Sequence, residues 1–223
     1  MAFSVTRTGV EEPASAAARS RAETRRRLIE AGTDLFARAG LARTTTTQIA
    51  RAAGVAAGTF YLHFPDKHSL FREIAFAALA ELRARTAAAH DGAAPDRVAQ
   101  LRARMETLVA FAAEKRDLVR IVFGRGPEAG EIGAELADAL FPGVEARLRD
   151  RAGEGRIDPA LDPAVAAQAL VASWIRVVAW WAQDPSRAPR EAVVETLVRL
   201  HPVFTRSEQD RSTRRSRPTR RPR

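Results

Sequence analysis

The segment from Gly40 to Leu70 constrains the fold of this chain more than any other. It reads GLARTTTTQIARAAGVAAGTFYLHFPDKHSL. Thr45 and Gln48 have the spacing of a capping box, in which each side chain accepts a hydrogen bond from the other's backbone N–H, so a helix begins there. Gly54 is placed to end that helix, and Asp66 is suited to cap a later one. The segment therefore predicts two short helices joined by a tight turn, between two longer helices.

The second short helix has one apolar face and one face of small and polar residues. Phe60 and Phe64 are four residues apart, so they share a face and can anchor the helix to a core. Gly58 on the other face costs about 1 kcal/mol of helix stability relative to Ala, and close approach of another molecule is the physical reason to accept that cost. The major groove of DNA, ~12 Å wide, admits one α-helix. A helix-turn-helix over residues 45–64 is the prediction.

Several side chains of this segment can contact DNA. Tyr61 can donate its hydroxyl to a phosphate, and His63 can do the same or meet a base edge. Lys67 lies in the first turn of the next helix, where a cation opposes the helix dipole unless an anion such as a phosphate is near. The predicted DNA-binding residues are Thr45, Thr46, Thr47, Ala57, Gly58, Thr59, Tyr61, His63 and Lys67.

The rest of the chain also has helical patterns. Ser20 and Glu23 form a second candidate capping box, so we expect a helix from about 20 to 39 after a flexible arm at 1–19. Asp162 followed by Pro163 starts another helix. Further helices are expected near 66–90, 96–113, 117–123, 130–152, 163–183 and 189–205. No stretch shows sustained strand alternation, so the predicted fold is all-α.

Composition and charge exclude several classes of function. The net charge is +9, and most of it lies in residues 206–223, with eight Arg against two acidic groups. Such a tail suits a phosphate partner, or it is a disordered solubilising segment. There are no cysteines, and the four histidines lack metal-ligand spacing. No phosphate-binding Gly-rich loop, nucleophile motif, signal peptide or membrane-length apolar run is visible. We therefore expect a cytoplasmic protein that is not an enzyme and holds no metal or cofactor.

Residues 22–82 resemble, without a gap, the DNA-binding domain of the tetracycline-repressor (TetR) family of bacterial transcription regulators. Two positions depart from the family pattern. Ala56 stands where a Ser usually caps the recognition helix, and Ala57 where Lys or Arg is frequent. We hypothesise that the basic tail or the arginine cluster at residues 25–27 compensates for the phosphate contact missing at position 57. The resemblance rests on Ala31, Leu35, Phe36, Gly40, Thr44, Thr45, Ile49, Ala50, Ala53, Gly54, Val55, Gly58, Thr59, Phe60, Tyr61, His63, Phe64, Lys67 and Leu70.

The resemblance implies a homodimer that binds a palindromic operator, usually as a repressor, with a DNA-binding domain at 20–82. It assigns residues 83–205 to effector binding and dimerisation, the dimer forming through helices 163–183 and 189–205. The first of these helices is apolar nearly all round, which predicts a cover on every side, although a monomeric core helix is an alternative. A helical ligand-binding or adaptor protein with weak or lost DNA binding is the rival function.

A small-molecule effector pocket is expected among the middle helices. Most of its candidate residues also suit an ordinary core. Arg176 lies among apolar neighbours, so we expect a buried guanidinium facing either a ligand or an acidic group across the dimer. The candidate lining is Met105, Leu108, Phe111, Phe123, Trp174, Arg176, Val178 and Trp181.

Overall fold

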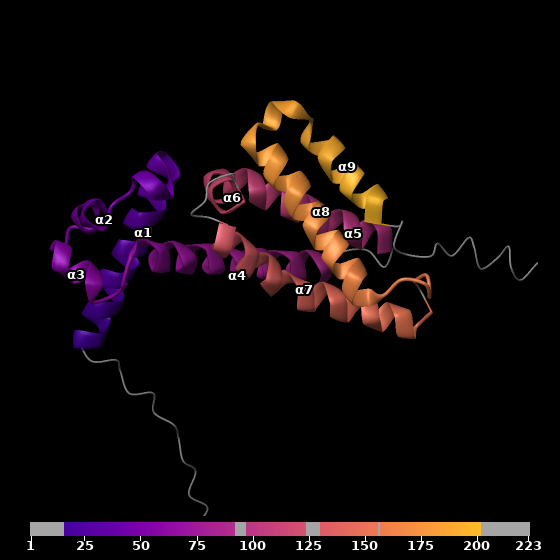
Figure 1. Cartoon of the computed structure of the whole chain (residues 1–223), viewed down its shortest axis with the longest axis horizontal. Coiled ribbons are helices and arrows are strands. Elements are labelled where there is room, and N and C mark those ends of the chain that lie inside the picture. The colour runs from indigo at the N-terminus through magenta and orange to yellow at the C-terminus, as the bar shows by residue number, and fades with distance from the viewer. Residues whose placement is uncertain (1–15, 92–96, 124–129, 156, 202–223) are drawn as a thin grey trace, which may run out of the picture.

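The computed structural model describes residues 16–91, 97–123, 130–155 and 157–201, and its regular structure there is helical throughout, which confirms the all-α prediction (Figure 1). The elements are α1 (Ala16–Arg43), α2 (Thr46–Ala52), α3 (Ala57–Tyr61), α4 (Lys67–Asp91), α5 (Arg97–Glu114), α6 (Arg116–Val122), α7 (Gly130–Gly153), α8 (Pro163–Gln183), the 3-10 turn η1 (Pro185–Arg187) and α9 (Arg190–Leu200). A small N-terminal lobe of α1–α3 lies at one end of α4, and the remaining helices lie along the rest of it.

The start of α1 differs from the prediction. The helix already includes residues 16–19, which we assigned to a flexible arm, so Ser20 lies inside the helix and caps nothing. Glu23 instead accepts hydrogen bonds from Arg26, at 2.6 and 2.9 Å. The physical reason is that Ala and Arg are strong helix formers, and three alanines precede Arg19. Residues 1–15 of the arm and the tail at 206–223 lie outside the described residues.

Gly40 has a backbone φ of +79°, a value that L side chains rarely adopt, and it breaks the helical geometry of α1 near its end. The bend lets Leu41 turn into the core, where it is 3% exposed. Thr44 follows as a buried polar residue, and its hydroxyl donates to the Gly40 carbonyl at 2.8 Å. The predicted end of the first helix is therefore a kink that sets the direction of the chain into α2.

One hydrophobic core joins the N-terminal lobe to the body. Phe36 of α1 and Phe71 of α4 meet edge to face, with ring centroids 5.3 Å apart. Ile132 and Leu136 of α7 and Val122 of α6 belong to the same buried cluster. Because an apolar cluster packs as one unit, the N-terminal lobe is held to α6 and α7 as well as to α4.

The body has two further buried clusters. One is formed by α5, α8 and α9, and the other by α7 and α8. Trp174 of α8 packs against both. Helix α8 begins as predicted, because the Asp162 carboxylate accepts hydrogen bonds from the backbone N–H groups of Ala164 and Val165. The Arg116 guanidinium donates to the carbonyls of Ala182 and Gln183 and so caps the other end.

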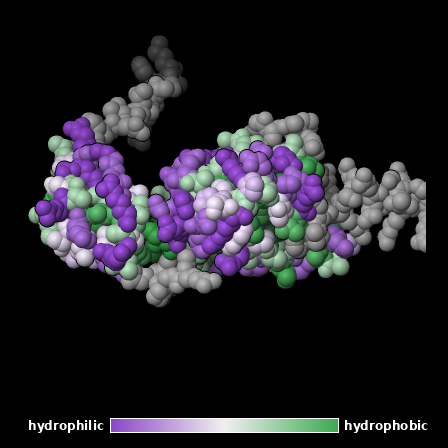
Figure 2. Space-filling model, turned by 90° about the horizontal axis from the view of Figure 1, so that it is seen from above, coloured by the Kyte–Doolittle hydropathy of each residue, from purple (hydrophilic) through white to green (hydrophobic). Residues whose placement is uncertain are grey.

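Helix α8 is covered on one side only in this single chain. Its outward stripe is exposed, including Val165 at 68% and Trp180 at 38%. Within the described residues, α8 is the one helix long and apolar enough to cross a membrane by length and composition, with 39% of the tested window buried. Figure 2 looks down on the upper side of the body in Figure 1 and shows hydrophobic surface there between hydrophilic patches.

Candidate nucleic-acid interface

The predicted capping box of α2 is present. The Gln48 backbone N–H donates to Thr45 Oγ1 at 3.2 Å, and the Thr45 N–H donates to Gln48 Oε1 at 2.9 Å. Ile49 is fully buried and Ala53 nearly so, which fixes the inner face of the helix. Thr45 and Thr47 are exposed and Thr46 is partly exposed, so all three hydroxyls lie at the solvent-facing start of α2.

Helix α3 is short and is anchored as predicted. Phe60 and Phe64 are 0% and 2% exposed, and their ring centroids are 5.8 Å apart. Ala56 is the N-cap, in extended conformation and without a side-chain hydrogen bond. A cap residue without a side-chain acceptor leaves the first N–H groups of a helix unsatisfied by the protein. The anchoring of α3 therefore comes from its aromatic side, and its leading end is open.

The outward face of α3 is free of contacts around its glycine. A Cβ placed on Gly58 would meet no other atom within 4 Å, and its φ is not in the left-handed range. Nothing within the described chain thus requires a glycine at this position. Ala57 is exposed and Thr59 partly so.

Tyr61 connects the two helices of the motif at the exposed surface. Its side chain is 58% exposed, and its hydroxyl lies 3.0 Å from the Thr46 hydroxyl. Leu62 beside it is 69% exposed, and it was not among the predicted DNA-binding residues. An exposed apolar side chain on a groove-facing helix is suited to contact a thymine methyl group.

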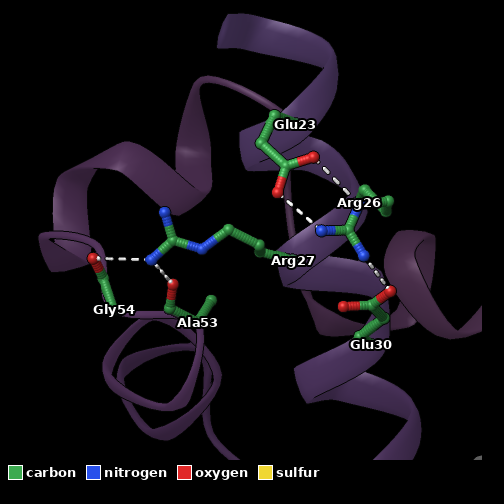
Figure 3. Close-up of polar contacts among 6 residues, drawn as sticks. All are labelled: Glu23, Arg26, Arg27, Glu30, Ala53 and Gly54. Carbon is green, nitrogen blue, oxygen red and sulfur yellow. Dashed lines mark hydrogen bonds and ion pairs between the residues drawn. The ribbon is translucent and has the colours of Figure 1, made fainter.

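The turn between α2 and α3 is fixed by an arginine that sequence reasoning did not single out. Arg27 of α1 donates from its guanidinium to the carbonyls of Ala53 and Gly54, the latter at 3.1 Å (Figure 3). Gly54 has a φ of +66°, which fits its predicted role as the stop of α2. Arg27 thus satisfies the carbonyls at the end of α2 and ties the motif to α1.

The other two arginines of the 25–27 cluster are also engaged within the protein. Arg26 pairs with Glu23 and Glu30 on α1 (Figure 3). Arg25 pairs with Glu73 of α4, and its guanidinium carbon lies 4.6 Å from the centre of the Phe64 ring. The cluster therefore holds α1, the turn and α4 together, and its charge is already matched by carboxylates and carbonyls. This argues against the hypothesis that it replaces a phosphate contact at position 57.

Lys67 has acceptors within the protein. Its Nζ donates to the carbonyls of Leu41 and Ala42, at 2.9 and 3.1 Å. These carbonyls lie at the end of α1, where a cation is favourable. An anion is therefore not needed to explain a lysine at this position, and its phosphate contact stays a prediction.

His63 is partly buried and follows the C-terminal end of α3. Burial lowers the pKa of its imidazole, and the positive charges of Arg21 and Arg25 lower that pKa further. A nearby phosphate would act in the opposite direction. The site therefore combines hydroxyls, an imidazole, an exposed leucine and a short open helix on one surface.

Comparison with known proteins decides between a generic helical hairpin and a DNA-binding family. Residues 28–74 match the model of the bacterial regulatory proteins of the tetR family. This region is a DNA-binding domain of the TetR type, and the matched relatives are transcriptional regulators. The match covers α1 from Leu28, both helices of the motif and the first part of α4.

Relatives and solved structures agree with the TetR assignment. The uncharacterized HTH-type transcriptional regulator YdgC of Bacillus subtilis is 29% identical over 130 residues, which cover 57% of this chain and 67% of YdgC. NalD of Pseudomonas aeruginosa, the secondary repressor of a multidrug efflux pump, superposes with a TM-score of 0.64 at 24% identity, covering 85% of this chain and 98% of NalD. The transcriptional regulator FadR of Bacillus subtilis, solved with stearoyl-CoA, gives 0.66 at 19% identity over 78% and 96%. These two structures establish the fold.

The predicted effector-pocket residues do not form one group. Met105, Leu108, Trp174, Val178 and Trp181 belong to the cluster of α5, α8 and α9. Phe111 is buried, with Arg85 over its ring. Phe123 instead packs against the core of the N-terminal lobe.

Arg176 is exposed, which corrects the expectation of a buried guanidinium. It borders an open hollow of about 380 Å³ between α8 and α9, together with Trp180, Ala192 and Thr196. The reason for the error is that a helix apolar on nearly every side does not reveal which side meets the core.

Proposed function

We propose that this TetR-family regulator is a ligand-responsive repressor that binds a palindromic operator as a homodimer. DNA binding is supported mainly by the outward face of α3. Gly58 has free space around it there, and the side chains of Tyr61 and Leu62 are exposed. A helix with such a face can approach base edges closely. The hydroxyls at the start of α2 lie beside it and suit the phosphate backbone.

The homodimer is supported by the exposed side of α8. Val165, Ala169, Ala172, Arg176 and Trp180 form an exposed stripe at helical spacing. Large apolar side chains exposed along one face of a long helix are typical of a surface that a partner covers. Leu200, 48% exposed on α9, extends the apolar surface. A second copy of the chain would cover these helices symmetrically, and two reading heads require a palindrome.

Response to a small molecule is supported by two proteins of similar fold and by the core that joins the body to the N-terminal lobe. FadR of Bacillus subtilis was solved with stearoyl-CoA, and SmeT of Stenotrophomonas maltophilia is named as the repressor of a multidrug efflux pump. The core shared by α1, α4, α6 and α7 gives a ligand in the body a physical route to the reading head. We place the protein in the cytoplasm, where its DNA is.

A mobility-shift assay on DNA flanking the protein's own gene tests the repressor. We expect a shifted band that resists excess nonspecific competitor and weakens steeply as salt rises, because lysine, arginine and helix dipoles replace counterions on phosphates. If nonspecific competitor abolishes this band as easily as it abolishes a band on unrelated DNA, binding is not specific. That result would favour the rival function, a helical ligand-binding or adaptor protein with weak or lost DNA binding. The rival function is supported by the absence of a side-chain cap at Ala56, because an uncapped α3 would bind DNA more weakly.

A further inference from the structure

Four basic side chains from three helices gather where the two clusters of the body meet. Arg104 lies on α5, Arg147 and Arg151 lie one turn apart on α7, and His201 follows α9. The positive charges of all three arginines act on the His201 imidazole, and the charges of Arg104 and Arg151 act on Arg147. The ring of His201 stacks on Trp174, with centroids 6.1 Å apart and planes 15° from parallel. We call these four residues the basic cluster.

Two members of the basic cluster lack the partners that neighbouring arginines have. Arg102, two residues before Arg104, pairs with Glu195, and Arg149, two residues after Arg147, pairs with Glu145. Within the part of the chain that the structure describes, Arg104 and Arg147 form no ion pair or hydrogen bond. Burial lowers the pKa of Arg104. The side chain of Arg147 keeps contact with solvent, but the protein atoms around it and the charges of Arg104 and Arg151 lower its pKa as well. Arg104 and Arg147 lie near other positive charges without an acidic partner of their own, which raises the energy of the folded protein unless an anion is bound.

The surroundings of the basic cluster suit the apolar part of a ligand. Trp174 is partly buried between the two clusters, and Phe141 and Ile175 are partly buried beside it. Arg147 is solvent-exposed, so a ligand has access to its guanidinium. Arginine forks match carboxylate and phosphate groups by bidentate hydrogen bonds.

We propose that the basic cluster binds the effector of this regulator, and that the effector is a small organic anion. Its carboxylate or phosphate group pairs with Arg104 and Arg147, and its apolar part packs against Trp174. The regulatory role of this site rests on the proposed function as a ligand-responsive repressor. The binding site itself is testable without DNA.

Three probes with one ring system and different head groups test the proposal: 1-naphthoate, 1-naphthyl phosphate and the uncharged 1-naphthol. Binding to the full chain is measured by probe fluorescence at pH 7 and constant ionic strength. We expect at least one anion to bind tenfold or more tightly than the naphthol, and the better anion identifies the head group. The double variant Arg104→Gln/Arg147→Gln should lose this preference, and the control Arg149→Gln should keep it. An equal affinity for all three probes, or an unchanged preference in the double variant, would overturn the proposal.

Thermal unfolding without a probe gives a second test that does not depend on the choice of ring. Removing two charges that repel their neighbours should leave the melting temperature of the double variant equal to or above that of the wild type. A melting temperature several degrees below it would mean that the two arginines stabilise the fold, and the proposal would be wrong. If the wild type shows no specific DNA binding, the proposed repressor function is wrong, but the proposed anion site is not contradicted.

Discussion

At the scale of single residues, the surface proposed to face DNA contains positions that serve the fold and positions that do not. Gly54 needs its glycine for a φ of +66°, whereas Gly58 has an ordinary backbone and empty space around it. Nothing within the described residues requires a glycine at position 58, which fits the proposed approach of α3 to DNA. Sequence reasoning reached this glycine from its helix cost alone. It left Leu62 out of the candidate site, and it did not find the bonds of Arg27, because a hydrogen bond across 26 positions depends on the fold.

Replacing Gly58 by alanine should separate stability from DNA binding. Because Ala is the better helix former, Gly58→Ala is expected to stabilise the protein by about 0.5–1 kcal/mol. The added methyl group lies on the face proposed to approach the groove, so operator affinity should fall about tenfold. Urea unfolding and a mobility shift measure the two effects. A variant that binds DNA as tightly as the wild type would show that α3 does not approach the groove by this face.

His201 should make stability depend on pH. Burial and the charges of Arg151, Arg104 and Arg147 lower its pKa from 6.5 to about 4. Above pH 6.5 the residue is neutral in both the folded and the unfolded chain, and between 6.5 and 4 only the unfolded chain takes up the proton. Stability should therefore fall as the pH drops through this window. From pH 7 to pH 5 we expect the wild type to lose about 1–2 kcal/mol more than His201→Phe.

The control for this experiment is His68→Phe, because His68 is exposed in α4. The stability of His68→Phe should depend on pH in the same way as that of the wild type. A difference seen only in His201→Phe then comes from His201, because the carboxylates are the same in all three proteins. Identical pH profiles for His201→Phe and the wild type in urea unfolding would contradict the account.

At the scale of helices, the sequence predicts helix caps correctly where the two hydrogen-bonding residues are a few positions apart. The capping box at Thr45 and the caps at Asp66 and Asp162 are formed as expected. The signal at Ser20 failed because the alanines before it continue the helix. The acceptors of Lys67 lie 26 and 25 positions away, and the outward side of α8 depends on packing with other helices. Such non-local features cannot be predicted from spacing.

A serine at position 56 should stabilise α3. Ala56 is the N-cap of α3 in the extended conformation that capping residues adopt, but it has no side-chain acceptor. Ala56→Ser should therefore add about 0.5–1 kcal/mol to the free energy of unfolding. If fraying of α3 limits DNA binding, operator affinity should rise as well. The control Ala52→Ser adds a hydroxyl at the exposed last residue of α2 and should not stabilise. A fall in stability for Ala56→Ser, measured by urea unfolding, would contradict the assigned helix start.

At the scale of the whole molecule, the exposed stripe of α8 and the DNA-facing surface of α3 belong to one account. The stripe needs a cover, and a recognition helix of five residues is short to specify a site alone. A symmetric pair provides the cover and doubles the DNA contacts. In the proposed dimer, the core that α6 and α7 share with the N-terminal lobe would let the body alter the spacing of the two recognition helices.

A charge placed on the stripe should separate the pair. Ala169→Glu would bury an unpaired carboxylate in the dimer, which costs several kcal/mol, and leave it in water in the monomer. Sedimentation velocity should show monomers for Ala169→Glu and dimers for the wild type and for the control Ala146→Glu, an exposed position on α7. Dimers of unchanged affinity in Ala169→Glu would place the interface elsewhere.

Selection of bound DNA from a random pool tests the central claim most directly. The full chain is incubated with random duplexes at physiological salt, and bound DNA is recovered and sequenced over several rounds. A symmetric pair of reading heads predicts an enriched palindrome with two equal half-sites, and Gly58→Ala should enrich it less. Enrichment of a single asymmetric half-site, or of no sequence at all, would contradict the account.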